Sequence, residues 1–241
     1  MQLDRGRPAA ALALIVALSA CGPSKETLRQ GESAVAAAAR AKTVAQAGEV
    51  MATRREAQPS LDSARMGFVA KDAATTAKAL RSAALFARRQ ADSAAQPART
   101  ALANSANELD RLAGRFDKSG VTALSSVTAL DAAFARMQLA EAQLHCTRAL
   151  DAWKQANAGA TSSEMVMLAD HFERGAKDGA VTLDSAAQHA SATIRAVALK
   201  LGQGATVTPS EVDSALNAMD KEVHDLMAKV AKLPGSRQND N

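Results

Sequence analysis

The stretch MGFVAKDAATTAKALRSAALFARRQADSA, residues 66–94, carries the pattern that predicts how this chain folds. Small or apolar residues recur along it alternately four and three positions apart, a spacing that places them on one face of a helix and is typical of packed helices. Most are alanine, which lets two backbones approach closely. The pattern predicts a helix from about Ser60 to Ala94. Its packing positions are Met66, Ala70, Ala73, Ala77, Leu80, Ala84, Ala87, Ala91 and Ala94.

The composition extends this prediction to the rest of the chain. Hydrophobic residues make up 47% of the 241 residues, yet aromatic residues make up only 2%. Alanine has the highest helix propensity, whereas strands favour the β-branched and aromatic residues that are scarce here. The sequence therefore predicts an all-α, Ala-rich and elongated bundle of coiled-coil-like antiparallel helices, about five to six in number.

Two further predictions concern the neighbours of this helix. A first helix is expected over residues 24–57, also with small packing residues, and it ends where Pro59 removes a hydrogen-bond donor. Because only a short turn at Pro59 separates the two helices, we expect the first helix to form an antiparallel hairpin with the helix from Ser60. Pro97 then interrupts the pattern. A kink is favoured there over a new helix, because Gln96 is a poor N-cap.

The second half of the chain continues the same periodicity with several interruptions. A turn is predicted at Gly120, which can adopt the left-handed conformation that ends many helices. The alternative is one unbroken helix, because the spacing continues in the same phase beyond Gly120. The following helix runs past Trp153 and stops in a loop over residues 157–163. Another helix is expected over residues 163–201, where Gly175 and Gly179 mark either a tight helix crossing or a local break.

The last helix has the strongest local signal. Thr208-Pro209-Ser210-Glu211 combines a capping threonine, a proline at the first helical position and a glutamate placed to complete a capping box. The helix is expected to end at Pro234-Gly235. Its packing positions are Val212, Leu216, Met219, Val223, Leu226, Val230 and Leu233, larger than those of the earlier helices.

The beginning of the chain carries a different kind of signal. Arg5 and Arg7 precede an apolar run over residues 9–18 that is too short to span a bilayer as a helix. This arrangement indicates a secretion signal. The chain then reads Leu18-Ser19-Ala20-Cys21, with small residues directly before a cysteine.

These four residues resemble the lipobox of bacterial lipoproteins. The resemblance covers residues 1–21 and implies cleavage before Cys21, a thioether-linked diacylglyceryl group on its thiol and an acylated new amino terminus. Several buried acyl chains would anchor the protein stably, at roughly 0.8 kcal/mol per methylene. Gly22 stands where Asp favours inner-membrane retention in Gram-negative lipoproteins, so the expected location is the outer membrane, facing the periplasm.

The domain organisation follows from these signals. Residues 1–20 are expected to be a signal peptide that is removed, and residues 21–23 a lipid anchor and tether. Residues 24–234 are predicted to form the α-helical bundle, and the polar residues 235–241 a disordered tail.

Charge and motifs exclude several classes of function. The net charge is only +4. The two basic doublets, Arg54-Arg55 and Arg88-Arg89, have no interleaved aromatic residues of the kind that nucleic-acid binding requires. The common metal, nucleotide and acyl-transfer motifs do not occur in the sequence. We therefore expect no nucleic-acid partner, no cofactor and no enzymatic activity.

One region retains a possible binding role. His145, Cys146, Trp153 and His171 could surround a small ligand or a metal. Cys146 could also form an intermolecular bridge or act as a reactive thiol, with His145 and Arg148 nearby to lower its pKa. The alternative for Cys146 is a small buried hydrophobe. Glu141 with His145, and Asp220 with His224, are four residues apart on a helix, so each pair could bind metal or form a solvated hydrogen-bonded pair. The solvated pair is favoured in both cases. The complete histidine set is His145, His171, His189 and His224.

Two classes of function remain. The favoured one is a membrane-anchored envelope lipoprotein with a non-catalytic structural or interaction role, in contact with another envelope protein or with itself. The alternative is a periplasmic helical-bundle module that binds a small ligand or a metal.

Overall fold

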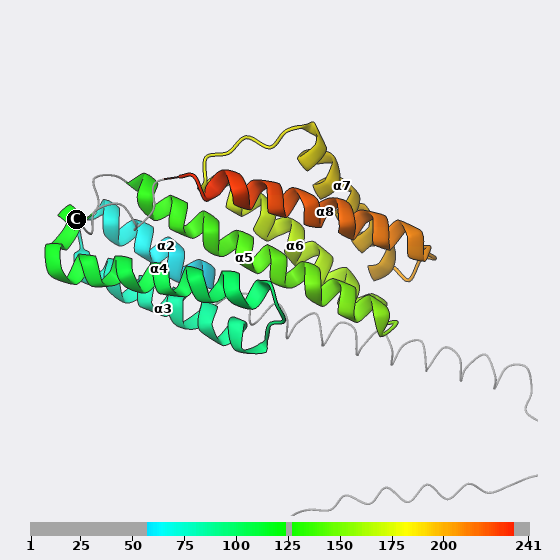
Figure 1. Ribbon diagram of the computed structural model, residues 1–241, viewed down its shortest axis with the longest axis horizontal. Helices are drawn as coiled ribbons and strands as arrows, with labels where there is room; N and C mark the ends of the chain where they lie inside the picture. Colours follow the sequence, from blue (N-terminus) through cyan, green and yellow to red (C-terminus); the bar gives the residue numbers. More distant parts are fainter. Residues whose placement is uncertain (1–56, 124–126, 234–241) are drawn as a thin grey trace, which may run out of the picture. The chain divides into compact units, whose positions relative to one another are not determined.

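The computed structural model describes residues 57–123 and 127–233, in which every regular element is helical (Figure 1). The expected signal peptide, Cys21, the first helix up to residue 56 and the tail lie outside these ranges. The described elements are α2 (Ala57–Val69), α3 (Ala73–Ser93), α4 (Ala98–Ser119), a short 3-10 helix η1 (Gly120–Ala123), α5 (Val127–Lys154), α6 (Ala158–Asp178), α7 (Ser185–Gly202) and α8 (Pro209–Val230).

The all-α class is confirmed for the described residues, but the predicted number of helices is wrong. Seven α-helices are present in these ranges alone, against five to six expected for the whole chain. The difference arises because the helices expected over residues 60–94 and 163–201 are each divided in two, and because Pro97 separates two helices.

Helix α5 lies at the centre of the described helices and contacts α2, α4, α6 and α8. Its buried residues occur on all its faces, as expected for a helix surrounded by other helices. One set of core side chains, the N-terminal cluster, joins α2, α3 and α4 to the first half of α5. Another, the C-terminal cluster, joins α5 from Ala135 onward to α6, α7 and α8. The two clusters therefore share one helix.

The alanine pattern of residues 66–94 is confirmed along α3 from Ala77 onward, whereas Ala73 is partly buried and Ala70 is exposed. Ala77, Leu80, Ala84, Ala87, Ala91 and Ala94 are all buried. Within the described residues α3 packs most extensively against α4, and next against α2. The hairpin expected with the helix over residues 24–57 lies outside the described residues.

A single helix over residues 60–94 was the wrong prediction, because the chain breaks between Val69 and Ala73. Lys71 has a left-handed φ of 58°, and the side chain of Asp72 caps α3 by accepting a hydrogen bond from the Thr75 backbone N–H at 2.9 Å. Met66 is consequently 67% exposed instead of packed. The break turns α2 back against α3.

The kink predicted at Pro97 is also wrong. Helix α3 ends at Ser93, α4 begins at Ala98, and the two pack against each other as separate helices. Ala94 already has extended backbone, with φ −85° and ψ 148°, so α3 ends before Pro97.

The predicted turn at Gly120 is confirmed. This residue follows α4, has a positive φ of 59° and donates its backbone N–H to the carbonyl of Phe116. The loop expected over residues 157–163 is not present, since α6 begins at Ala158. Asn157 caps it by accepting a hydrogen bond from the Ala160 backbone N–H at 3.0 Å.

Gly175 and Gly179 fulfil both of the alternatives considered for them. Helix α6 ends at Asp178, so the helix expected over residues 163–201 is interrupted at Gly179. A Cβ atom on Gly175 would lie 2.7 Å from Cγ of Leu139, which shows how closely α6 approaches α5. The first glycine thus permits a tight crossing, and the second follows the end of the helix.

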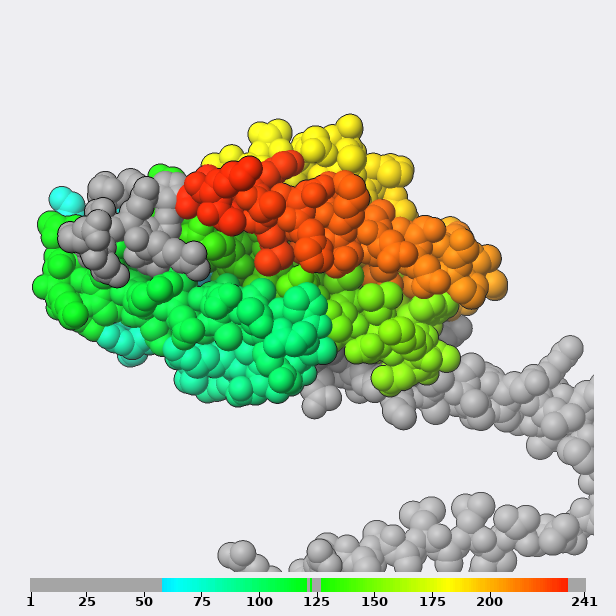
Figure 2. All heavy atoms as spheres, in the orientation of Figure 1, coloured from blue at the N-terminus to red at the C-terminus, as the bar shows by residue number. Residues whose placement is uncertain are grey.

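The last helix has the predicted start and the predicted buried face. Thr208 and Glu211 form a complete capping box at the start of α8. All the predicted packing positions from Val212 to Val230 are buried, and Leu233 is partly buried against the C-terminal cluster. In Figure 2, α8 covers part of the surface of α5. Among the described residues, we find no helix with both the length and the apolar character to cross a membrane.

Candidate functional site

Helix α5 buries an unusual number of polar side chains. Gln138, Glu141 and His145 are at most 5% exposed and are spaced three and four apart, so they share one face of the helix. Ionisable side chains are seldom fully buried unless they are paired. This face of α5 is therefore the strongest candidate for a functional site among the described residues.

Two histidines and two glutamates pair across the boundary between α5 and α6, and of the four only Glu164 is partly exposed. Nδ1 of His145 lies 2.6 Å from Oε2 of Glu164, and Nδ1 of His171 lies 2.9 Å from Oε2 of Glu141. The two imidazole rings stack with centroids 5.1 Å apart and planes inclined by 13°. We call Glu141, His145, Glu164 and His171 the His-Glu cluster.

This arrangement replaces the pairing predicted within α5. Glu141 and His145 are four apart, but the structure pairs each of them with a side chain of α6. A pair across two helices fixes their relative position, which a solvated pair on one helix would not do. The pair of Asp220 and His224 does lie within one helix, at 3.5 Å, and both side chains are about half exposed.

A chain of amide contacts extends the cluster to α2. Oε1 of Gln138 lies 2.7 Å from Nδ1 of His171, and Nε2 of Gln138 donates to Oε1 of Gln58 at 3.0 Å. The same Oε1 of Gln58 accepts a hydrogen bond from Arg174 at 3.2 Å. Three helices thus meet at these polar contacts.

Glu141 is the exception in this network. The residue is 2% exposed, and neither of its carboxylate oxygens has a hydrogen-bond partner among the described residues. Its 2.9 Å contact with Nδ1 of His171 is an ion pair only where that ring is protonated, since the ring N–H is directed to Gln138. An ionised carboxylate buried in this way is stabilised mainly by whatever positive charge the two rings can carry.

Burial also changes the pKa of the His145 ring. It lowers the pKa of His145 below its ordinary value of about 6.5, and this effect outweighs the hydrogen bond to Glu164, which raises it. The charge of His171 lowers the pKa of His145 further. His145 is therefore mainly neutral at neutral pH.

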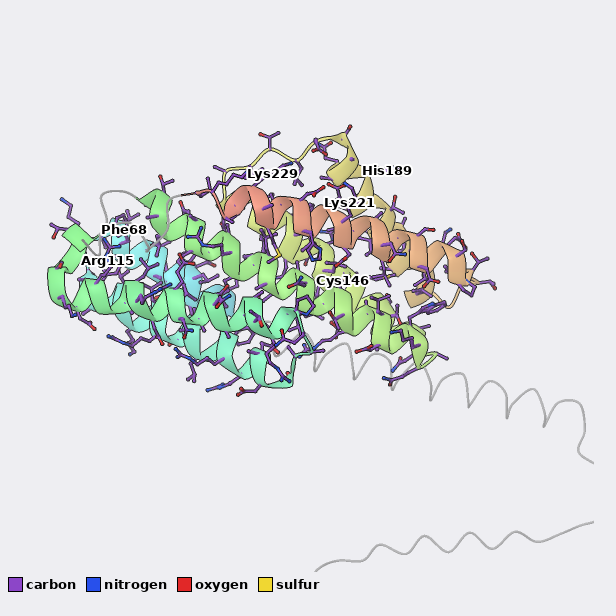
Figure 3. The ribbon with its side chains drawn as sticks, viewed as in Figure 1. Phe68, Arg115, Cys146, His189, Lys221 and Lys229 are labelled. Carbon is purple, nitrogen blue, oxygen red and sulfur yellow. The ribbon has the colours of Figure 1, made fainter. Side chains whose placement is uncertain are left out.

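Cys146 follows His145 directly on α5 and is labelled in Figure 3. It is 3% exposed and belongs to the C-terminal cluster. Burial, assisted by the carboxylate of Asp220, raises the pKa of its thiol to about 12. A thiol that stays protonated is a poor nucleophile, so the structure favours the small buried hydrophobe over the reactive thiol.

The remaining residues of the predicted binding region do not join the cluster. Trp153 is partly buried and packs against the C-terminal cluster, two helical turns beyond His145. Arg148, expected to lower the pKa of the thiol, instead donates to Gln90 and Ser93 of α3. His189, labelled in Figure 3, is exposed on α7. Of the four residues proposed, the structure brings together only His145 and His171.

Two arginines join helices of both core clusters. Arg136 of α5 makes a two-pronged contact with Glu108 of α4, at 2.6 and 2.7 Å, and also donates to the carbonyl of Val230 in α8 at 3.2 Å. Arg65 of α2 contacts Asp131 of α5 at 2.7 Å and Asp178 of α6 at 3.1 Å. These contacts connect elements that belong to different clusters.

Some residues of the His-Glu cluster and its amide contacts are unusual in the sequence itself. Glu141 and Gln138 are polar residues at core-facing positions of a helix that is otherwise apolar there, which marks them as unusual. Glu164 gave no comparable signal, since it stands among small and polar residues near the start of α6. Its contact with His145 depends on how α5 and α6 cross.

No group of three or more His, Cys, Asp and Glu side chains within residues 57–123 and 127–233 is arranged to hold a metal ion. In comparisons with known proteins, no family model, no curated protein and no solved structure matches this chain. The class that the described residues define is an all-α bundle with a buried, ionisable contact between two of its central helices.

Proposed function

We propose that this protein is a membrane-anchored bacterial envelope lipoprotein with a non-catalytic structural or interaction role. The observation that carries the proposal is the sequence Leu18-Ser19-Ala20-Cys21 directly after a short apolar run. Cys21 receives the lipid, and the outer membrane facing the periplasm is its proposed location. The helical domain that follows the anchor is proposed to contact another envelope protein or a second copy of the chain.

The character of the helical domain supports a non-catalytic role. The buried titratable side chains of α5 and α6 contact one another across the helix boundary. The thiol of Cys146 is buried and has a raised pKa. The polar groups with the most unusual surroundings therefore act between helices, where they fix the positions of the helices.

The anchor is tested by Cys21→Ser. Wild-type protein expressed with a fatty-acid analogue should take up the label and sediment with membranes, whereas Cys21→Ser should take up none and appear in the soluble fraction. Cys146→Ser is the matched control and should behave as wild type, because that thiol is buried in the helical domain. An unlabelled wild type, together with a Cys21→Ser variant that still sediments with membranes, would show that the protein is not a lipoprotein.

The alternative function, a helical-bundle module for a small ligand or metal, draws on one observation. The fold brings His145 and His171 together beside a carboxylate of Glu141 that has no hydrogen-bond partner among the described residues. Zinc, nickel or a small anion added to the purified chain should raise the melting temperature in wild type and not in His171→Gln if this function holds. If none of these additions changes the melting temperature of the wild-type chain, the binding function is refuted and the structural or interaction role remains.

A further inference from the structure

The position of the ring hydrogen of His171 can be derived from the contacts around it. Nε2 of Gln58 donates to Asp62 at 2.9 Å, and Arg174, which has no acceptor, donates to Oε1 of Gln58 at 3.2 Å. The orientation of the Gln58 amide is therefore fixed from both ends. Its Oε1 must accept from Nε2 of Gln138.

The orientation of Gln138 follows directly. Because its Nε2 faces Gln58, its Oε1 faces Nδ1 of His171 at 2.7 Å. An amide oxygen only accepts hydrogen bonds, so Nδ1 of His171 must carry a hydrogen. The free lone pair of the neutral ring is then on Nε2, and a second proton can be added only there.

The same reasoning applies to the other ring. Nδ1 of His145 lies 2.6 Å from Oε2 of Glu164, and an ionised carboxylate only accepts, so this Nδ1 also carries a hydrogen. Both rings thus direct an N–H toward an oxygen acceptor, and both take up a further proton on Nε2. Each uptake adds one positive charge to a buried contact.

We propose that the His-Glu cluster makes the contact between α5 and α6 sensitive to pH, so that the helices stay packed while one ring is neutral and separate there when both rings are protonated. The geometry supplies the reason. Two protonated rings would stack with their centroids 5.1 Å apart in a buried position, where like charges repel strongly. Each protonated ring has a carboxylate at 2.6 or 2.9 Å, but only the doubly protonated pair adds the repulsion between the two rings.

The charged groups around the cluster are few. On α5 it faces Glu141, and on α6 it faces Glu164, with Arg174 held by Gln58. From α2 the nearest charge in this chain of contacts is Asp62, which accepts from Gln58. Asp220 and His224 of α8 act on Cys146 and Gln143 of α5, and Arg148 contacts α3. Among residues 57–123 and 127–233, only Glu141 and Glu164 contact the rings closely enough to neutralise them.

The direction of the pH effect follows from burial. The pKa of His145 is lowered in the folded chain, so the unfolded chain binds more protons as the pH falls below about 6.5. The stability that the neutral ring contributes is present above this pH and is lost as the pH falls toward the lowered folded value. Each pH unit in that window should raise the unfolding constant by up to about tenfold.

The experiment compares the full chain in a mild non-ionic detergent with His145→Gln and His224→Gln over about pH 8 to pH 5. Wild type should lose stability below about pH 6.5, and His145→Gln should lose most of this slope. His224→Gln is the matched control, because it removes an exposed histidine, and should keep the wild-type slope. A uniform loss of stability in His145→Gln, with an unchanged slope, would overturn the proposal.

A second measurement uses the wild-type chain alone and stays decisive if His145→Gln does not fold. Proton NMR should show one buried histidine titrating below the other histidines, and amide hydrogen exchange across α5 and α6 should accelerate in the same pH range after correction for intrinsic rates. A ring of His145 that titrates with the exposed histidines, or unchanged exchange in α5 and α6, would contradict the proposal. Neither measurement depends on the lipid anchor.

Discussion

Gly175 sets how closely α5 and α6 can approach each other. A Cβ atom there would lie 2.7 Å from Cγ and 2.8 Å from Cδ2 of Leu139, whose side chain is fully buried. The close approach matters for the His-Glu cluster, because its pairs of 2.6 and 2.9 Å cross the same helix boundary.

We predict that Gly175→Ala destabilises the protein although alanine is the better helix former. The helix propensity gain is about 0.5 to 1 kcal/mol, whereas overpacking a dense core costs about 1 to 3 kcal/mol. Gly114→Ala in α4 is the matched control, because nothing lies within 4 Å of its added Cβ atom. Urea denaturation should show a lower free energy of unfolding for Gly175→Ala and a higher one for Gly114→Ala. If both variants were more stable than wild type, α5 and α6 would be less tightly packed at Gly175 than the structure shows.

At the same scale, the sequence indicated which residues were unusual but not what they contact. Glu141 could be recognised as a polar residue in an apolar pattern, and His145 as its neighbour four positions along. The structure pairs them instead with His171 and Glu164. Which side chains face each other across two helices depends on their crossing and rotation, and one-dimensional spacing does not contain this information.

At the scale of the elements, the alanine face of α3 accounts for the close packing of the N-terminal cluster. Ala77 and Ala84 are at most 1% exposed and lie among side chains of α2, α4 and α5. We predict that Ala77→Leu and Ala84→Leu each cost about 1 to 3 kcal/mol of stability, because the larger side chains force the helices apart.

A control on the same helix separates packing from helix propensity. Ala74 is exposed, so Ala74→Leu should change the free energy of unfolding by less than about 0.5 kcal/mol. Thermal and urea denaturation of the three variants supply the comparison. If the two buried substitutions leave stability unchanged or raise it, alanine is not required for close packing on this face.

The helix boundaries show which local signals are sufficient. The start of α8 was predicted correctly because its capping box is formed by neighbouring residues and needs no tertiary contact. The break between α2 and α3 was missed because the four-three spacing continues through it. There, a Cβ atom on Gly67 would lie 2.8 Å from Oγ1 of Thr76, so the turn depends on a close approach that periodicity does not reveal.

At the scale of the whole described domain, α5 is shared by the two core clusters, so we expect them to unfold as one unit. Leu130 and Phe134 of α5 belong to the N-terminal cluster, whereas Leu139 and Ala142 belong to the C-terminal cluster. One helix cannot remain folded for one cluster and unfold for the other without a break in its middle. Arg136 adds a direct connection, since it contacts Glu108 of α4 and the Val230 carbonyl of α8.

The last prediction tests this shared helix by perturbing one cluster and observing the other. Val223 and Leu226 of α8 are at most 2% exposed. Val223→Ala and Leu226→Ala, which are combined in a double variant, should therefore each lower the free energy of unfolding, the leucine substitution by about 2 to 5 kcal/mol. Leu199→Ala is the control, because that side chain is 61% exposed and should matter little. Trp153, the single tryptophan, reports on the C-terminal cluster, and circular dichroism reports on all helices.

Because α5 belongs to both clusters, the two probes should give coincident melting curves in wild type and in every variant. The double variant in α8 should lower both midpoints equally, and Ala84→Leu in the N-terminal cluster should lower the midpoint of Trp153 fluorescence although it lies in the other cluster. If Ala84→Leu shifts only the circular dichroism, or if the curves separate, the two clusters unfold independently and α5 does not couple them. Unchanged melting of the double variant would instead show that α8 contributes little to the core, and its apolar face would then be the first place to look for a partner.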